Sequence, residues 1–255
     1  MRSFLIFTGK ECTEHIRSKR LLILGLVFIL FGIMSPAAAK FMPEILKMAG
    51  NDTGVIIQMN PPTVLDSYLQ FFKNMNSIAV IVLLLVFAGL VVDEKAKGTA
   101  SILLTKNLSR PAFVLAKFTA AAVLWTAIYA VSAFICQGYT LWLFPSESAR
   151  HLLISFAAYW LYGLLLLALT IFASTAAKSH GLATLGAFAA WGLLMLSMIP
   201  KKAAAISPAS LGAINLQVIA GTMPTSDLLV PAIAATALIA LALGCASWAI
   251  TRQEL

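Results

Sequence analysis

Six apolar stretches, each close to the length of a membrane-spanning helix, run through this chain of 255 residues. A helix needs about 20 mainly apolar residues to cross the ~30 Å hydrocarbon core of a bilayer at ~1.5 Å per residue. The six stretches cover residues 21–39, 73–92, 112–138, 152–177, 181–199 and 228–250. They predict an all-α integral membrane protein with six transmembrane helices, in which residues 1–255 form a single transmembrane domain.

The composition supports a membrane location. Hydrophobic residues make up 60% of the chain and charged residues only 11%, whereas a soluble domain is about half apolar and about a quarter charged. The formal net charge of +8 therefore indicates basic loops beside a membrane rather than a nucleic-acid surface. The cysteines Cys12, Cys136 and Cys245 are far apart and do not have the spacing of a disulfide framework or a metal site.

The basic residues predict the orientation. If the N-terminus lies inside, twelve of the 18 Lys and Arg residues fall on the inner side and six on the outer side. The positive-inside rule then places both termini in the cytoplasm. An alternative for residues 17–39 is a cleavable signal peptide, because a basic segment precedes an apolar run and a triple alanine. Five further spans follow, and an uncleaved first span fits them better.

The predicted spans contain almost no ionisable side chains. Lys117, near the start of the third span, is the exception. Proton- and ion-coupled transporters carry acidic, basic or histidine side chains within the membrane, so a self-powered transporter is disfavoured. The chain has no GxxxxGK[ST] phosphate loop and no HExxH motif. His15, His151 and His180 fall near the predicted interfaces, which disfavours an intramembrane enzyme, and no catalytic or metal-binding residue is predicted.

Residues 3–20 predict an amphipathic helix in the inner membrane interface. Apolar residues alternate with charged ones there, and Lys10 lies four positions before Glu14, so the two share a helix face. The alternative is an ordinary basic flank that only fixes the topology of the first span.

Two connecting segments carry further signals. Residues 200–227 are predicted outside, yet they hold an apolar run too short to cross, which indicates a re-entrant or interfacial segment. Residues 93–111 form a cytoplasmic loop in which Gly98 permits a turn and Thr99 can cap a short helix. Ser109 can cap the next span. The short helix would have an apolar face made by Ile102, Leu103, Leu104 and Leu108. An apolar face of this kind suits docking into a groove of another protein.

These segments also carry a resemblance to a known family. The sequence reads Glu94-Lys95, then Gly98-Thr99, then Leu108-Ser109-Arg110-Pro111, with Lys117 at the start of the following span. The N-terminal segment adds Lys10-Glu11, Glu14, Arg17 and Lys19-Arg20. The pattern resembles permease subunits of ABC-2-type ABC transporters, in particular the single-domain, six-span group that includes the nitrous-oxide-reductase maturation permeases. Many relatives have proline where this chain has Asn107.

The resemblance implies a type V exporter-like permease fold and a function. The 93–110 loop would be a coupling helix seated in a separate ATP-binding subunit, which would hold ATP and Mg; this chain would need no cofactor. The implied contact residues are Glu94, Gly98, Thr99, Ile102, Leu103, Leu108, Ser109 and Arg110, and those of the interface helix are Lys10, Glu11, Glu14 and Arg17.

The resemblance further implies a partner and a location. A second permease copy or a paralogue would complete an exporter in a bacterial or archaeal cytoplasmic membrane, with no nucleic-acid partner. The substrate stays open. The alternative is a membrane anchor or peptide-immunity subunit that binds without transport.

Overall fold

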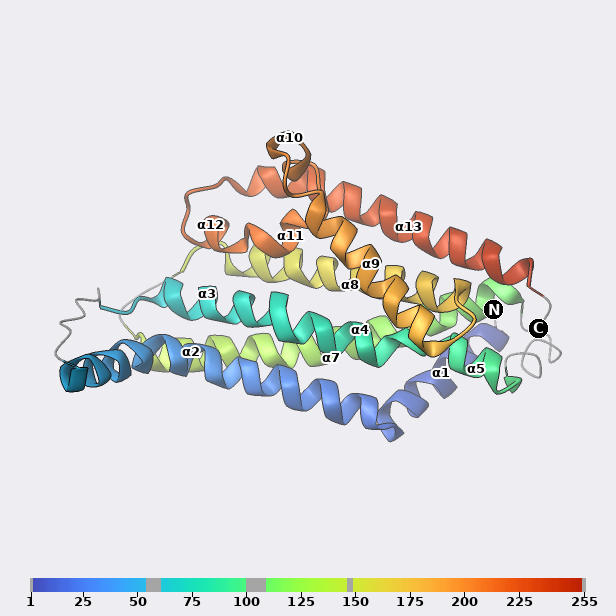
Figure 1. Ribbon diagram of the computed structural model, residues 1–255, viewed down its shortest axis with the longest axis horizontal. Helices are drawn as coiled ribbons and strands as arrows, with labels where there is room; N and C mark the ends of the chain where they lie inside the picture. Colours follow the sequence, from blue (N-terminus) through green and yellow to red (C-terminus); the bar gives the residue numbers. More distant parts are fainter. Residues whose placement is uncertain (1, 54–60, 100–108, 146–148, 254–255) are drawn as a thin grey trace.

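The chain folds into an elongated bundle whose long helices run roughly along one axis, with both termini at the same end (Figure 1). The computed structural model describes residues 2–53, 61–99, 109–145 and 149–253. Within these ranges the secondary structure is helical and contains no strands, which confirms the predicted all-α class. The end that holds both termini is called the terminal end, and the opposite one the distal end.

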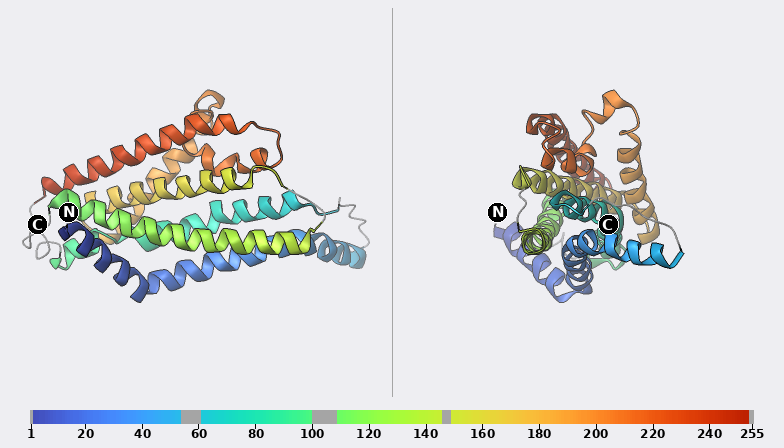
Figure 2. Two further views of the ribbon diagram at one scale, coloured as in Figure 1. Left: turned by 180° about the vertical axis from the view of Figure 1, so that it is seen from behind. Right: turned by 90° about the vertical axis from the view of Figure 1, so that its left-hand side faces the viewer.

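Two helices separated at Ser18 open the chain, α1 (Arg2–Arg17) and α2 (Lys19–Thr53). The first span was predicted at residues 21–39, but α2 continues through Pro36 and Pro43. Beyond the predicted span, α2 also occupies residues 44–49. With 35 residues, α2 is about 50 Å long at ~1.5 Å per residue, which exceeds the ~30 Å hydrocarbon core. Its distal part projects beyond the main bundle (Figures 1 and 2).

The second span is assembled from consecutive helical pieces. They are α3 (Val64–Asn74), the π-helical turn η1 (Met75–Ala79), α4 (Val80–Ala88) and, after a turn, α5 (Val92–Ala96). The helix that leads into the predicted span begins at Val64, nine residues before the predicted start at residue 73. The Asp66 carboxylate accepts a hydrogen bond of 2.8 Å from the Thr63 amide, so a capping box fixes the start of the helix.

Four more long helices complete the bundle, α7 (Arg110–Leu143), α8 (Leu152–Ala176), α9 (His180–Leu196) and α13 (Leu229–Thr251). Among the described residues, five helical stretches are long and apolar enough to cross a membrane, and α9 is a shorter apolar helix. With 17 residues, α9 is about 25 Å long at ~1.5 Å per residue. Six spans were predicted, and α9 occupies the fifth of them, ending before the predicted residue 199.

Short helices fill the connection between α9 and α13. They are α10 (Lys201–Ala204), α11 (Ser210–Ala213), α12 (Asn215–Ile219) and the 3-10 turn η2 (Thr225–Leu228). Leu211, Val218 and Ile219 are buried, and the Asn76 side-chain amide donates a 2.6 Å hydrogen bond to the Gly212 carbonyl. The segment is therefore apolar because α11 and α12 pack onto α8 and α12 onto α3. A re-entrant or interfacial position in the bilayer stays a prediction.

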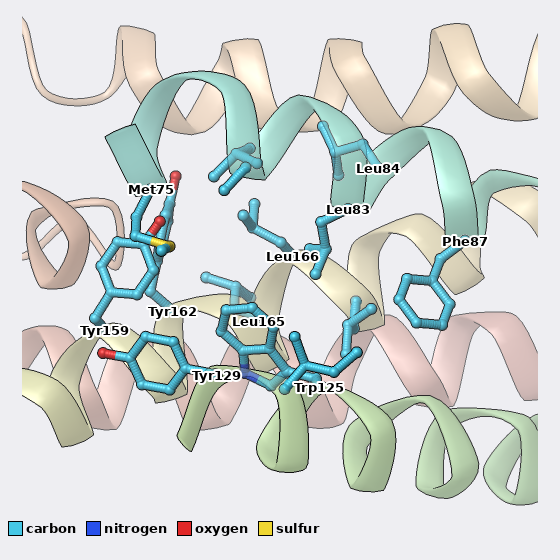
Figure 3. Close-up of a cluster of buried hydrophobic side chains, with 14 of the residues drawn as sticks. Met75, Leu83, Leu84, Phe87, Trp125, Tyr129, Tyr159, Tyr162, Leu165 and Leu166 are labelled. Carbon is cyan, nitrogen blue, oxygen red and sulfur yellow. The ribbon is translucent and has the colours of Figure 1, made fainter. Parts of the chain in front are cut away.

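Aromatic side chains build the centre of the core where α4, α7 and α8 meet (Figure 3). Trp125 and Tyr129 stack with their ring centroids 5.0 Å apart, and Tyr129 stacks on Tyr159 at 5.7 Å. The Trp125 indole donates a 3.0 Å hydrogen bond to the Trp160 carbonyl. A Cβ on Gly163 would occupy the space of this indole, so α7 and α8 approach closely because position 163 has no side chain.

Candidate functional site

The N-terminal helix α1 is docked onto α7 through one of its faces. Phe7, Glu11 and His15 are spaced four residues apart, so they lie on the same face, and all three are buried. Phe7 stacks on Phe113 of α7 with ring centroids 5.6 Å apart. Leu5 and Ile16 are 66% and 63% exposed, so an apolar surface remains on α1. The helix predicted at residues 3–20 is present as α1 and the start of α2, with Glu11 facing the bundle. Its position in the inner membrane interface stays a prediction.

A buried group of ion pairs joins α1, α5 and α7. The Lys117 ammonium lies 2.8 Å from a Glu11 oxygen and 2.8 Å from a Glu94 oxygen. Lys10 extends the group outward, at 3.3 Å from Glu11, 3.0 Å from Glu14 and 4.0 Å from Glu94. The Lys117 and Glu11 side chains are only 2% and 1% exposed. These five residues are called the charge cluster.

The surroundings of Lys117 explain why its ion pairs matter. Its ammonium lies 5.2 Å from the Phe113 ring centroid and 5.9 Å from that of Phe7. Aromatic faces attract a cation and exclude water. A buried charge is tolerated only when it is paired and hydrogen-bonded, because desolvation of an isolated ion costs several kcal/mol. Lys117 therefore depends on both carboxylates, and α1 and α5 are joined through it.

The charge cluster is a poor site for a metal ion. Carboxylate oxygens of Glu11, Glu14 and Glu94 come within 4.8 Å of one another. Lys117 and Lys10 already lie against these oxygens. A divalent cation would have to displace a buried ammonium and then bear its repulsion at short range. The arrangement suits a mechanical connection between helices rather than metal chemistry.

His15 lies next to the charge cluster in a nonpolar setting. Its ring meets the edge of Phe87 at a centroid distance of 5.9 Å, and its buried Nε2 has no hydrogen-bond partner among the described residues. Burial, together with the charge of Arg20, lowers the pKa of His15 from 6.5 to about 4. His15 is therefore neutral in the folded protein at pH 7.

Acidification is expected to loosen the docked α1. Unfolded His15 takes up a proton near pH 6.5, whereas the folded protein resists protonation down to about pH 4. Stability is therefore retained above pH 6.5 and lost progressively as the pH falls from 6.5 toward 4. Melting curves of the purified chain across this range should show the decline, and His15→Gln should flatten it. His151→Asn, at an exposed position, is the control and should leave the decline in place.

The first end of the 93–110 loop is tightly folded. Gly98 has a φ of +70°, in the left-handed region that glycine adopts at the end of a helix, so the predicted turn is confirmed. The Thr99 hydroxyl donates a 3.2 Å hydrogen bond to the Glu94 carbonyl. The Ser174 hydroxyl of α8 accepts the amides of Val91 and Val92 at 3.0 and 3.1 Å. The chain that leads into the loop is thereby fixed to α8.

The second end of the loop is the start of α7. The Ser109 hydroxyl accepts the Ala112 amide at 3.4 Å, and Pro111 lies in the first turn, which confirms the predicted cap. The Arg110 guanidinium donates to the Ile250 and Thr251 carbonyls, each at 2.9 Å. The loop thus leaves and re-enters the bundle at defined points on the terminal end.

The sequence profile of the family described as "ABC-2 family transporter protein" matches residues 5–249. The chain belongs to this family. It is also similar to the uncharacterized transmembrane protein YxlG of Bacillus subtilis (strain 168), at 21% identity over 184 residues, which covers 72% of this chain and 71% of that protein.

Family membership makes the chain a multi-pass membrane component of an ABC transporter, a permease subunit rather than a catalytic one. The resemblance found in the loop and N-terminal motifs is confirmed. In ABC-2 proteins this assignment implies partnership with an ATP-binding subunit. The terminal end, with α1, α5 and the loop ends, is the natural candidate for that contact (Figure 1).

The structure separates the ABC-2 motif residues into two groups. Glu11 and Glu94 bind Lys117 within the chain, and Arg110 binds carbonyls of α13. Their side chains are thus engaged inside the permease. The residues that remain open at the surface are Lys10, Glu14, Arg17, Thr99 and Ser109. Ile102, Leu103, Leu108 and the short helix expected at 100–107 lie outside the described residues, and their contact with an ATPase stays a prediction.

Three residues of this ABC-2 site were missed as functional candidates in the sequence. Lys117 was noted as a charge near the start of a span and as part of the family pattern, but not as a site residue, and Ser174 and Gln253 were not noted at all. The charge of Lys117 inside an apolar stretch was the one available signal, because such a residue requires a partner. Nothing in the sequence indicated that Glu11 would be that partner.

Proposed function

We propose that this ABC-2 permease exports its substrate using ATP hydrolysed by a separate subunit, with the terminal end facing the cytoplasm. One observation carries the proposal. The charge cluster joins α1, the start of the 93–110 loop and α7 in one buried unit at this end, while the predicted spans hold no ionisable residue at mid-depth. The driving force then has to enter from outside the bundle, at the loop.

The proposed cycle uses the loop and α1 together. Closure of the ATPase subunits displaces the 93–110 loop, and Glu94 passes this movement to Lys117 and Glu11. Because α1 is held by the same ammonium, α1 and α7 follow. Two copies of the chain, or one copy and a paralogue, would face each other so that the movement opens and closes a path between them.

An apolar groove favours a membrane-soluble substrate. A groove of about 470 Å³ lies between α7 and α8 and is lined by Tyr129, Phe134, Phe156 and Trp160 among others. Its few polar groups are already used, since the Trp160 indole donates to the Thr126 hydroxyl at 2.9 Å. A charged solute would find no partner there. Screening lipid-like and drug-like compounds for stimulation of ATP hydrolysis tests this choice.

Replacement of the loop tests the function. The tagged full-length chain is purified from its native host in mild detergent, and the ATPase subunit that copurifies is identified by mass spectrometry. Replacing residues 100–107 by a Gly-Ser segment of equal length should abolish recovery of the ATPase, because the apolar docking face is lost. The control replaces residues 54–59 in the same way and should recover the ATPase fully.

The proposal fails if no ATPase copurifies with the unaltered chain, or if the loop variant recovers as much ATPase as the control. A membrane anchor or peptide-binding subunit would give a different result in proteoliposomes. It would retain its bound peptide regardless of ATP, whereas an exporter moves substrate only while ATP is hydrolysed.

A further inference from the structure

The two ends of the 93–110 loop are attached to the ends of two other helices, α8 and α13. At the first end, the Lys95 ammonium donates to the Thr175 carbonyl at 2.7 Å and to the Ala177 carbonyl at 2.9 Å. These carbonyls close the C-terminal turn of α8. The last carbonyls of a helix lack intrahelical partners and carry partial negative charge. Lys95 therefore caps α8 from the loop.

The second end repeats the arrangement on another helix. One terminal nitrogen of the Arg110 guanidinium lies 2.9 Å from each of the Ile250, Thr251 and Gln253 carbonyls. Ile250 and Thr251 belong to the last turn of α13. Arg110 therefore caps α13 from the loop, by the same electrostatic attraction that Lys95 exerts on α8.

Gln253 connects the two attachments. Its side-chain oxygen accepts the Lys95 ammonium at 2.8 Å, and its backbone oxygen accepts the Arg110 guanidinium at 2.9 Å. Its side-chain nitrogen donates to the Thr175 carbonyl at 3.1 Å. Gln253, which follows α13, thus contacts both ends of the loop and the end of α8. Charge-assisted hydrogen bonds of this kind are stronger than neutral ones.

We propose that Gln253 clamps the base of the 93–110 loop and that Lys95 and Arg110 are positioning residues that transmit movement of the loop to α8 and α13. The transmission step rests on the proposed function, because it needs an ATPase to move the loop. The clamp itself is a property of the isolated chain. If Lys95 and Arg110 only capped their helices, the Gln253 side chain would not be needed, because each of the two cations could cap its helix alone.

Distance measurements on the isolated chain test the clamp. Spin labels are placed at the exposed positions Lys97 and Arg252 in a chain whose Cys12, Cys136 and Cys245 are replaced, and the protein is held in lipid nanodiscs. The unaltered clamp should give one narrow distance distribution. Gln253→Ala should broaden it, because Lys95 and the end of α8 then lose their hydrogen bonds to the Gln253 side chain, while Arg110 still binds the backbone oxygen of residue 253.

Two variants control this experiment. Gln253→Glu keeps the oxygen that accepts Lys95 and should keep the distribution narrow. Gln217→Ala removes an exposed glutamine near the distal end and should have no effect. The clamp is refuted if Gln253→Ala gives a distribution as narrow as that of the unaltered chain.

The same labels test the transmission in the complex with the copurified ATPase. If the loop base and α13 move as a unit, the distance between positions 97 and 252 should be equal in the nucleotide-free and vanadate-trapped states. Lys95→Met should make the distance differ between the two states. The control is Lys97→Met, for which the label is moved from position 97 to position 96, and its distance should stay equal in the two states.

If the distance changes between the two states in the complex with the unaltered clamp, the proposed transmission is wrong. The proposed function would still stand, because the change shows that the ATPase acts on the loop. Failure to copurify any ATPase would overturn the proposed function and the transmission together, and the clamp would still be decided by the isolated chain.

Discussion

Replacing Lys117 by methionine is expected to destabilise the purified chain more than replacement of any exposed lysine. Methionine has a similar volume but no charge, so the Glu11 and Glu94 carboxylates, which are 1% and 14% exposed, would lose the buried ammonium between them. They would keep only the half-exposed Lys10, at 3.3 and 4.0 Å. Removing one partner of a buried ion pair costs about 3–5 kcal/mol. Melting of the chain in nanodiscs, followed by circular dichroism, measures the loss.

Two further variants distinguish an uncompensated charge from lost packing. Lys97→Met removes an exposed lysine of the 93–110 loop and should leave the melting temperature unchanged. Adding Glu11→Gln and Glu94→Gln to Lys117→Met should recover most of the stability, because the buried charges are then gone. If the triple variant is as unstable as the single one, the ion pairs are not the cause.

Gly163→Ala is expected to disrupt the centre of the core. The added methyl group would collide with the Trp125 indole, which would lose its 3.0 Å bond to the Trp160 carbonyl and its stacking on Tyr129. Overpacking of this kind costs about 1–3 kcal/mol. The measurement is the melting temperature together with the near-ultraviolet circular dichroism of the aromatic residues.

The control is another glycine-to-alanine substitution, at a position where the added methyl group has room. A Cβ on Gly192 of α9 would meet nothing within 4 Å, and alanine favours a helix over glycine by about 1 kcal/mol. Gly192→Ala should therefore leave stability equal or higher. The close approach of α7 and α8 is not essential if Gly163→Ala behaves in the same way.

The long helices could be predicted from the sequence because each apolar stretch has the length of a span. Such a stretch can be recognised without knowing which helices it packs against. Ends were predictable where a local cap exists, as with Ser109 at the start of α7. The distal part of α2 was not, because the apolar stretch ends near residue 39 and is followed by Lys40 and Pro43. Packing within the bundle, including Ser35 bonded to Asn74 at 3.0 Å, holds that region in a way that no local signal reveals.

The candidate site was predictable only in its outline. The motif around Glu94 and Arg110 indicated a loop that acts on another subunit, and family membership confirms the type of protein. The partners of these residues, Lys117 and the C-terminal carbonyls of α13, lie far along the chain. Such pairings depend on how the helices are arranged in space, which spacing within a short motif cannot encode.

The charge cluster can form only after residues that are far apart in the sequence have been synthesised. Glu11 precedes Lys117 by 106 positions, so at roughly 5–20 residues per second the ribosome needs about 5–20 s to supply the ammonium. During this interval α1 has only its apolar surface, with Leu5 and Ile16, to hold it at the bilayer. The contact between Lys95 and Gln253 takes longer to form, because Gln253 follows Lys95 by 158 positions, whereas the Thr175 carbonyl follows it by only 80. The terminal end, which holds the charge cluster and the contacts of Gln253, is therefore assembled from segments that are synthesised many seconds apart.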